Sequence, residues 1–299
     1  MRKLLIIAGL AALCLALAWP APAAEKKLVV ASKAFTEQRL LGQLMILLLE
    51  KNGFTAVDKT GLGGTLVVRE ALMNKQIDIC MEYTGTALMT ILKAKTPITD
   101  PVKCYEEVKK MDEKNGVAWL PYIPFNNTYC LMMRKADAAQ LKLKTISDLA
   151  KYGLANPDKV SLGVTAEFYS RPDGYKPLQA AYGFKFTEDK IVKMDPGLLY
   201  KALKEGQVQV STGFATDGRI KEFDLVILED DKNYFPVYNP CVVVRKDTLD
   251  AHPELVKIFA PLSQKLDTKS MTELNFLVDG QHKPAKEVAQ EWLKKAGLL

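Results

Sequence analysis

The sequence predicts an α/β protein of two lobes, with a two-strand hinge and a ligand cleft between the lobes. Three observations support this class. Short apolar strands alternate with helices of about 10 to 15 residues, which is typical of α/β units with largely parallel sheets. One helix–strand unit occurs in each half of the chain, and two long extended segments can connect the lobes.

The first element is a segment with the order of a secretory signal peptide. A positively charged start precedes an uncharged apolar stretch, residues 4–19, and an A-x-A pattern over 21–23. The stretch is shorter than the roughly 20 residues that span a bilayer. We therefore expect residues 1–24 to be cleaved and the mature protein to be periplasmic. Cys14 is not preceded by a small residue, so a lipid anchor is not expected.

The mature chain opens with a strand over 28–32 and a helix over 35–52, whose dense leucines predict burial. Gly61 to Gly64 are expected to form a tight turn whose amides can face a polar ligand at the start of the next helix. Further strands are predicted over 77–81, 160–164, 191–194 and 208–211, and the chain from Leu249 reads as nearly all helical.

A short internal repeat occurs once in each half of the chain. Residues 71–79 end a helix and begin a strand, and residues 202–210 do the same. In both copies an aromatic residue, Tyr83 or Phe214, follows the opening alanine by 12 residues. Ligands of open α/β sheets bind beyond the carboxyl ends of the strands. Two similar lobes would therefore offer two such strand ends to one cleft.

Two extended segments, near 125–133 and 236–245, begin with turn formers and then become apolar. If both cross between the lobes, the first lobe is discontinuous and a two-strand hinge permits closure around a ligand. We accordingly expect lobe 1 to comprise residues 25–127 and 239–299, and lobe 2 to comprise residues 128–238.

The composition argues against several functions. The two histidines, His252 and His282, belong to no recognisable catalytic motif, and the chain has no P-loop or G-x-S-x-G. The net charge falls from +6 to +4 without the signal segment, and no basic block indicates nucleic acid. No C-x-x-C pair indicates zinc. We expect a monomer without enzymatic activity, cofactor or metal. The cysteines of the mature chain can form a disulfide or remain buried thiols: Cys80, Cys104, Cys130 and Cys241.

Aromatic residues stand at the predicted strand ends and crossings: Tyr83, Tyr129, Phe214 and Tyr238. A cluster of aromatic faces attracts a cation through the ring quadrupoles, at roughly 0.5–2 kcal/mol for each contact. A methylated ammonium suits such a cluster because it has no N–H that needs a partner. Each ring taken singly is more often a core residue, so the prediction depends on the two-lobe arrangement.

Five motifs carry a family resemblance, in the order S-K-A-F-T-E-Q (32–38), E-Y-T-G-T (82–86), R-P-D-G (171–174), M-D-P-G (194–197) and F-A-T-D-G-R (214–219). Together they resemble the substrate-binding proteins of glycine betaine/choline/carnitine ABC importers, from about Leu28 to the C-terminus. The resemblance implies a type II periplasmic-binding-protein fold. It also implies a membrane permease and a separate ATPase as partners.

The resemblance further implies a box for a trimethylammonium group, formed by the four aromatic residues, with Phe214 where many relatives carry Tyr. Lys33 and Arg171 match positions that face a ligand carboxylate, while Thr86 and Asn127 would add hydrogen bonds and Phe168 would line the wall. Structural alternatives stay open from the residues alone. Lys33 can be a solvated charge, Arg171 can pair with Asp173, and Thr86 can cap a helix.

Glycine betaine is the expected ligand, and the protein is expected to bind it without catalysing a reaction. Choline, carnitine or another betaine is the alternative within binding, and choline would leave the two cations without a carboxylate to bind. An enzyme on the same fold with Cys130 or Cys241 as nucleophile is a different class, and a sensor is a third.

Overall fold

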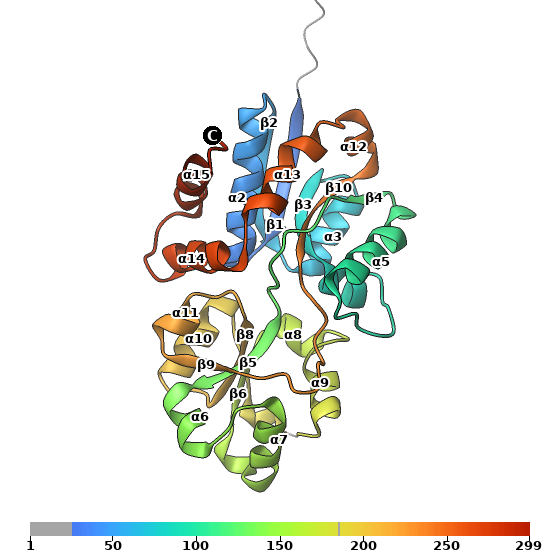
Figure 1. Ribbon diagram of the computed structural model, residues 1–299. Coiled ribbons are helices and arrows are strands. Elements are labelled where there is room, and N and C mark those ends of the chain that lie inside the picture. Colours follow the sequence, from blue (N-terminus) through green and yellow to red (C-terminus); the bar gives the residue numbers. More distant parts are fainter. Residues whose placement is uncertain (1–25, 185) are drawn as a thin grey trace, which may run out of the picture.

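Two five-stranded sheets organise the computed structural model of the protein, which describes residues 26–184 and 186–299. The expected signal peptide lies outside the described residues. Figure 1 shows two lobes end to end: the two ends of the described chain form one lobe, in blue-cyan and orange-red, and the green-yellow middle forms the other. No helix among the described residues is long and apolar enough to cross a membrane.

The two sheets share one topology. In each sheet, the first three strands in sheet order run parallel to one another. The fourth strand is antiparallel to the third, and the fifth, at the edge, is antiparallel to the fourth. In sheet order, the first consists of β2 (Thr55–Gly63), β1 (Lys27–Lys33), β3 (Ile79–Tyr83), β10 (Pro240–Arg245) and β4 (Val117–Trp119). The second consists of β7 (Ile191–Lys193), β6 (Leu162–Val164), β8 (Val210–Phe214), β5 (Tyr129–Arg134) and β9 (Leu225–Leu228).

This shared topology confirms the predicted internal repeat. β3 and β8 occupy the same place in their sheets, each after an equivalent helix, α3 (Thr65–Met73) or α10 (Pro196–Lys204). Because equivalent strands end at equivalent edges, Tyr83 and Phe214 come to the boundary between the lobes.

The other helices cover the sheets. Those of the first lobe are α2 (Thr36–Lys51), α4 (Thr84–Thr86) with the π-helical turn η1 (Ala87–Ile91), α5 (Pro101–Glu113), α12 (Lys246–Ala251), α13 (Leu255–Lys265), α14 (Thr268–Asp279) and α15 (Ala285–Lys295). Those of the second are α6 (Lys135–Leu141), α7 (Ile146–Ala155), α8 (Ala166–Ser170), α9 (Tyr175–Tyr182) and α11 (Arg219–Glu222), with the short 3₁₀ turns η2 (Pro157–Lys159) and η3 (Glu188–Lys190).

Helix α2 is the centre of the first lobe, as its leucine density predicts. Twelve of its sixteen residues are buried, and α13, α14 and α15 pack against it. The C-terminal segment is helical, also as predicted. One expectation is wrong: Gly61 and Gly63 belong to strand β2 and do not form a separate tight turn. The chain bends there by an irregularity in the pairing with β1, and Gly61 has a φ of +80°.

Two extended segments cross between the lobes, one leading into β5 and the other into β10 (Figure 1). They hydrogen-bond to each other where they meet. The Asn127 amide donates to the Tyr238 carbonyl at 3.1 Å, and the Tyr238 amide donates to Asn126 Oδ1 at 2.8 Å. The Asn239 side chain donates to the Phe125 carbonyl at 2.7 Å. The predicted two-strand hinge is therefore present.

Candidate ligand-binding site

A cavity of about 950 Å³ lies between the lobes, and residues from both lobes line it. Its first-lobe wall comes from the loop between β1 and α2, the end of β3, and α14. Its second-lobe wall comes from the ends of β6 and β8 and the start of α10. The cavity therefore lies beyond the carboxyl ends of parallel strands, where ligands of α/β sheets bind.

The four predicted aromatic residues all line this cavity: Tyr83, Tyr129, Phe214 and Tyr238. Tyr129 stands at the centre, with ring centroids 5.0 Å from Phe214 and 5.6 Å from Tyr238. The Tyr129–Tyr238 pair meets edge to face at 83°. The backbone explains part of the grouping, because Tyr129 pairs with Phe214 between β5 and β8. Tyr238 lies just before β10, whose first residue, Pro240, pairs with Tyr83.

Two further aromatic residues line the same cavity and were missed from the sequence: Tyr200 of α10 and Phe35. Phe35 comes from the first lobe. It stacks on Phe214 of the other lobe, with centroids 5.0 Å apart and planes 12° apart. It also faces Tyr83 at 6.4 Å. Phe35 belongs to the S-K-A-F-T-E-Q motif and follows the end of strand β1 by two residues. An aromatic residue at this place, beyond a strand end, could have been predicted to line the cavity.

Both predicted cations are already paired with carboxylates. Lys33 Nζ lies 2.6 Å from Glu82 Oε1 and 5.2 Å from the centroid of the Tyr83 ring. The Arg171 guanidinium donates to both carboxylate oxygens of Asp173, at 2.8 and 2.6 Å. Lys33 lines the cavity, and its charge is balanced within the wall.

Arg171 and Phe168 lie behind the wall and do not line the cavity. The Arg171 guanidinium sits 5.3 Å from the centroid of the Tyr129 ring, and the fully buried Phe168 packs on that ring at 4.6 Å. Asp173 also accepts a hydrogen bond from the Tyr238 hydroxyl at 3.1 Å. These residues therefore hold two rings of the wall in position.

Thr86 and Asn127 are buried and line the cavity, and Asn127 leads to a second feature that was missed. Its amide donates to Glu37 Oε1 at 2.7 Å, and the Tyr83 hydroxyl donates to the same oxygen at 2.7 Å. The other oxygen accepts from Thr216 at 2.5 Å and from Asn275 at 2.9 Å. Burial raises the pKa of Glu37, and the four hydrogen bonds lower it in part.

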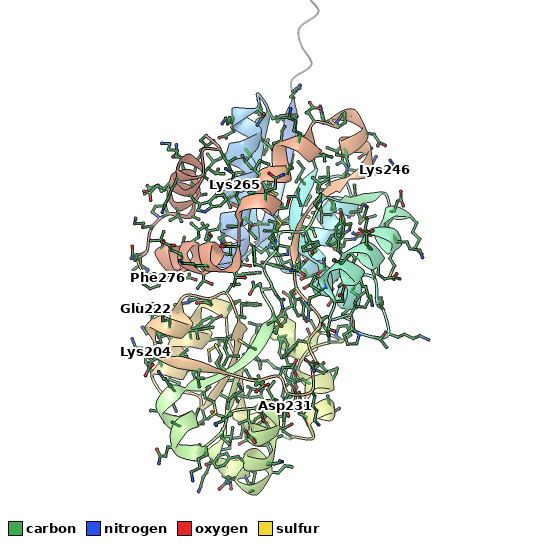
Figure 2. All side chains as sticks on the ribbon, viewed as in Figure 1. Lys204, Glu222, Asp231, Lys246, Lys265 and Phe276 are labelled. Atoms are coloured by element: carbon green, nitrogen blue, oxygen red, sulfur yellow. The ribbon has the colours of Figure 1, made fainter. Side chains whose placement is uncertain are left out.

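Further contacts join the lobes around the cavity. Arg219 of the second lobe pairs with Asp279 of the first at 3.1 Å, and Thr65 donates to Glu167 across the boundary at 2.6 Å. Figure 2 shows Phe276 of α14 and Glu222 of α11 on the facing edges of the two lobes. The structure thus represents a closed form, in which residues of both lobes touch around the cavity.

The four described cysteines are free and buried outside this wall. Burial raises the pKa of Cys80 to about 12 and that of Cys104 to about 11, and it raises the pKa of Cys130 and Cys241 as well. A thiol acts as a nucleophile through its thiolate. These environments disfavour that form. No group of three or more His, Cys, Asp or Glu within the described ranges is placed to hold a metal.

A two-lobed fold with an aromatic cavity at its hinge defines a solute-binding protein, and comparison with known families agrees. The model of the family described as the substrate binding domain of ABC-type glycine betaine transport systems matches residues 26–295. The chain belongs to this family. The fold is that of type II periplasmic binding proteins, and the family serves transport and not catalysis.

The chain is similar to a glycine-betaine-binding protein of Pseudomonas aeruginosa, with 39% identity over 98% of this chain and 96% of the relative. It is also similar to the ergothioneine transport permease/ergothioneine binding protein EgtU of Helicobacter pylori, with 38% identity over 92% of this chain but only 48% of that relative. A solved structure described as a glycine betaine/carnitine/choline ABC transporter covers 91% of this chain and 99% of its own, with 33% identity and a TM-score of 0.72.

Proposed function

We propose that this protein captures glycine betaine, or a closely related quaternary ammonium compound, in the cavity between its lobes. The observation that carries the proposal is the convergence of six aromatic rings on one interlobe cavity. Ring faces attract a methylated ammonium without requiring a hydrogen-bond donor from it. The relatives named for glycine betaine, carnitine and choline support the same ligand class.

We propose Lys33 as the group that meets the carboxylate of the ligand, because its ammonium lies in the cavity wall. Thr86 and Asn127 are the proposed polar neighbours. Arg171 is proposed to support the site and not to contact the ligand carboxylate. It would act through the rings of Tyr129 and Tyr238, which it and Asp173 hold in place.

Choline is the alternative candidate, because the structure weakens the argument against it. Lys33 and Arg171 would leave unsatisfied charges beside a ligand without a carboxylate, but both are paired with Glu82 and Asp173. Binding choline would therefore leave no unpaired positive charge on these two side chains, contrary to what the sequence alone suggested.

We further propose that the closed protein delivers its ligand, outside the cytoplasm, to a membrane permease driven by a separate ATPase, and that it acts as a monomer. Lobe 1 would comprise residues 25–127 and 239–299, and lobe 2 residues 128–238. The short hinge and the cross-lobe contacts support closure around a ligand.

Ligand-dependent thermal stability tests the proposal, because a ligand that binds only the native state raises the apparent stability. The panel is glycine betaine, choline, carnitine and ergothioneine, with glycine as a control that lacks the methyl groups. We expect glycine betaine to raise the melting temperature and glycine to leave it unchanged. If none of the four quaternary compounds raised it, the proposal would be wrong. Calorimetry then ranks glycine betaine against choline.

A further inference from the structure

Glu37 differs from every other buried carboxylate in the described chain. Each of the others forms an ion pair of 2.6 or 2.7 Å with a lysine or arginine: Glu82 with Lys33, Asp112 with Arg69, Asp173 with Arg171, and Asp217 with Arg219. Glu37 is only 3% exposed, and within the described ranges it forms no ion pair with a lysine or arginine. Its partners are the neutral donors of Tyr83, Asn127, Thr216 and Asn275.

Burying an ionised carboxylate without a counter-charge is costly, because neutral donors replace only part of its hydration. Proteins normally pair such a group or neutralise it. Burial accordingly raises the pKa of Glu37. Glu37 also lines the cavity, so a cation placed there can supply the missing charge.

The surroundings of Glu37 strengthen the negative character of this wall. Asn127 and Asn275 both donate their amide N–H groups to Glu37, which turns their amide oxygens away from it. Both oxygens are buried, and neither has a hydrogen-bond partner within the described residues. Both side chains line the cavity. Unpartnered oxygens of this kind suit the positively polarised C–H groups of an N-methylated ammonium.

We propose that Glu37 is the counter-charge for the ammonium group of the ligand, and that it makes the site select a cation over a neutral group of the same shape. The inference rests on the proposed function. It adds to the cation–π attraction of the aromatic rings a residue that carries a full negative charge.

Two ligands of the same shape that differ in charge separate the effect of the positive charge from the effect of shape. Glycine betaine and 3,3-dimethylbutanoate differ by a nitrogen in place of a carbon, so both carry the carboxylate and three methyl groups but only the first carries the positive charge. Their affinities are measured by calorimetry at pH 7.5 for the wild type and for Glu37→Gln. We expect the preference for glycine betaine over 3,3-dimethylbutanoate to fall at least tenfold in Glu37→Gln.

Two control variants separate charge from structure. Thr216→Val removes a hydrogen bond to Glu37 but keeps its charge, so both affinities should fall together and their ratio should stay the same. Asp231→Asn makes the same charge change as Glu37→Gln on the second lobe, away from the lobe boundary (Figure 2), and should leave both affinities unchanged. A ratio that is unchanged in Glu37→Gln would overturn the inference alone. A wild type that binds no quaternary ammonium compound would overturn the proposed function, and the inference with it.

A measurement on the wild type covers the case in which Glu37→Gln does not fold. A bound cation lowers the pKa of Glu37, so binding releases protons at pH values near the raised pKa of the empty site. Proton release is obtained from calorimetry in buffers of different ionisation enthalpy between pH 4 and 7. Glycine betaine should release more protons than 3,3-dimethylbutanoate, and equal release would contradict the inference. The isosteric pair cancels the effect of the ligand carboxylate on the titratable or charged groups around Glu37: Lys33, Glu82, Tyr83, Asp217, Arg219 and Asp279. Because burial also raises the pKa of Asp279, the measurement is repeated in Asp279→Asn, where the difference between the two ligands should remain.

Discussion

Removing the ring of Phe35 tests whether the cavity recognises its ligand through aromatic faces from both lobes. In Phe35→Ala, the ligand loses one cation–π contact, which is worth about 0.5–2 kcal/mol. The closed form also loses the stack of Phe35 on Phe214, where the centroids are 5.0 Å apart. Such a pair contributes about 0.5–1.5 kcal/mol beyond its buried area.

The two losses together amount to about 1–3.5 kcal/mol, and a tenfold change in affinity corresponds to about 1.4 kcal/mol. The dissociation constant for glycine betaine should therefore rise by about 5-fold to 300-fold. Calorimetry at 25 °C measures it directly. Phe35→Leu keeps most of the apolar volume without the π face, and it should restore only the part of the affinity that comes from packing.

A matched control is Phe223→Ala. Phe223 is likewise half-buried, but it lies outside the cavity with Lys204 over its ring at 4.3 Å. This variant should bind as the wild type does. If Phe35→Ala bound glycine betaine within twofold of Phe223→Ala, recognition by faces of both lobes would be refuted.

Three further predictions concern stability and reactivity. Asp112→Ala leaves Arg69 with no partner for its two hydrogen bonds of 2.8 and 2.7 Å, so the free energy of unfolding should fall by about 3–5 kcal/mol in a urea titration, with unchanged ligand affinity at low urea. All four described cysteine thiols should resist Ellman's reagent at pH 8 in the native protein and react after denaturation, because burial disfavours their thiolates; rapid native reaction would contradict their burial. The pKa values of Glu37 and Asp279 are raised in the folded protein, so these groups contribute stability at low pH that is lost as the pH rises through their folded values. The ligand-free wild type should therefore become more stable between pH 7 and pH 5, and Glu37→Gln should show a smaller gain in the same thermal scans.

The lobes were predictable because their signals are local. Strand and helix periodicity, the dense leucines of α2 and the repeated unit ending at Tyr83 and Phe214 are all readable within short windows. Strand β2 was not predicted, for a physical reason. It lies at the edge of its sheet, none of its residues is buried, and two of the nine are glycine. It therefore shows neither the apolar run nor the alternation that marks a strand.

The site was only partly predictable because its remaining contacts are distant in sequence. Glu37 stands in the first turn of α2, where an acidic residue is common for its interaction with the helix dipole. Its hydrogen-bond partners lie between 46 and 238 residues further along the chain, so no local pattern marks it as buried. Arg171 shows the opposite case. Its partner Asp173 is two residues away, and that pairing was readable as an alternative to a role in ligand contact.

Closure and recognition are joined by the matching arrangement of two short segments. Phe35 and Glu37 of the first lobe are two residues apart, as are Phe214 and Thr216 of the second. The rings face each other at 5.0 Å, while the Thr216 hydroxyl donates to Glu37 at 2.5 Å, so an opening motion that separates the rings also breaks the hydrogen bond. The apparent dissociation constant equals the intrinsic constant divided by the closed fraction. Contacts that join the lobes in the closed form, such as the ion pair of Arg219 with Asp279, should therefore contribute to the affinity in addition to the aromatic box.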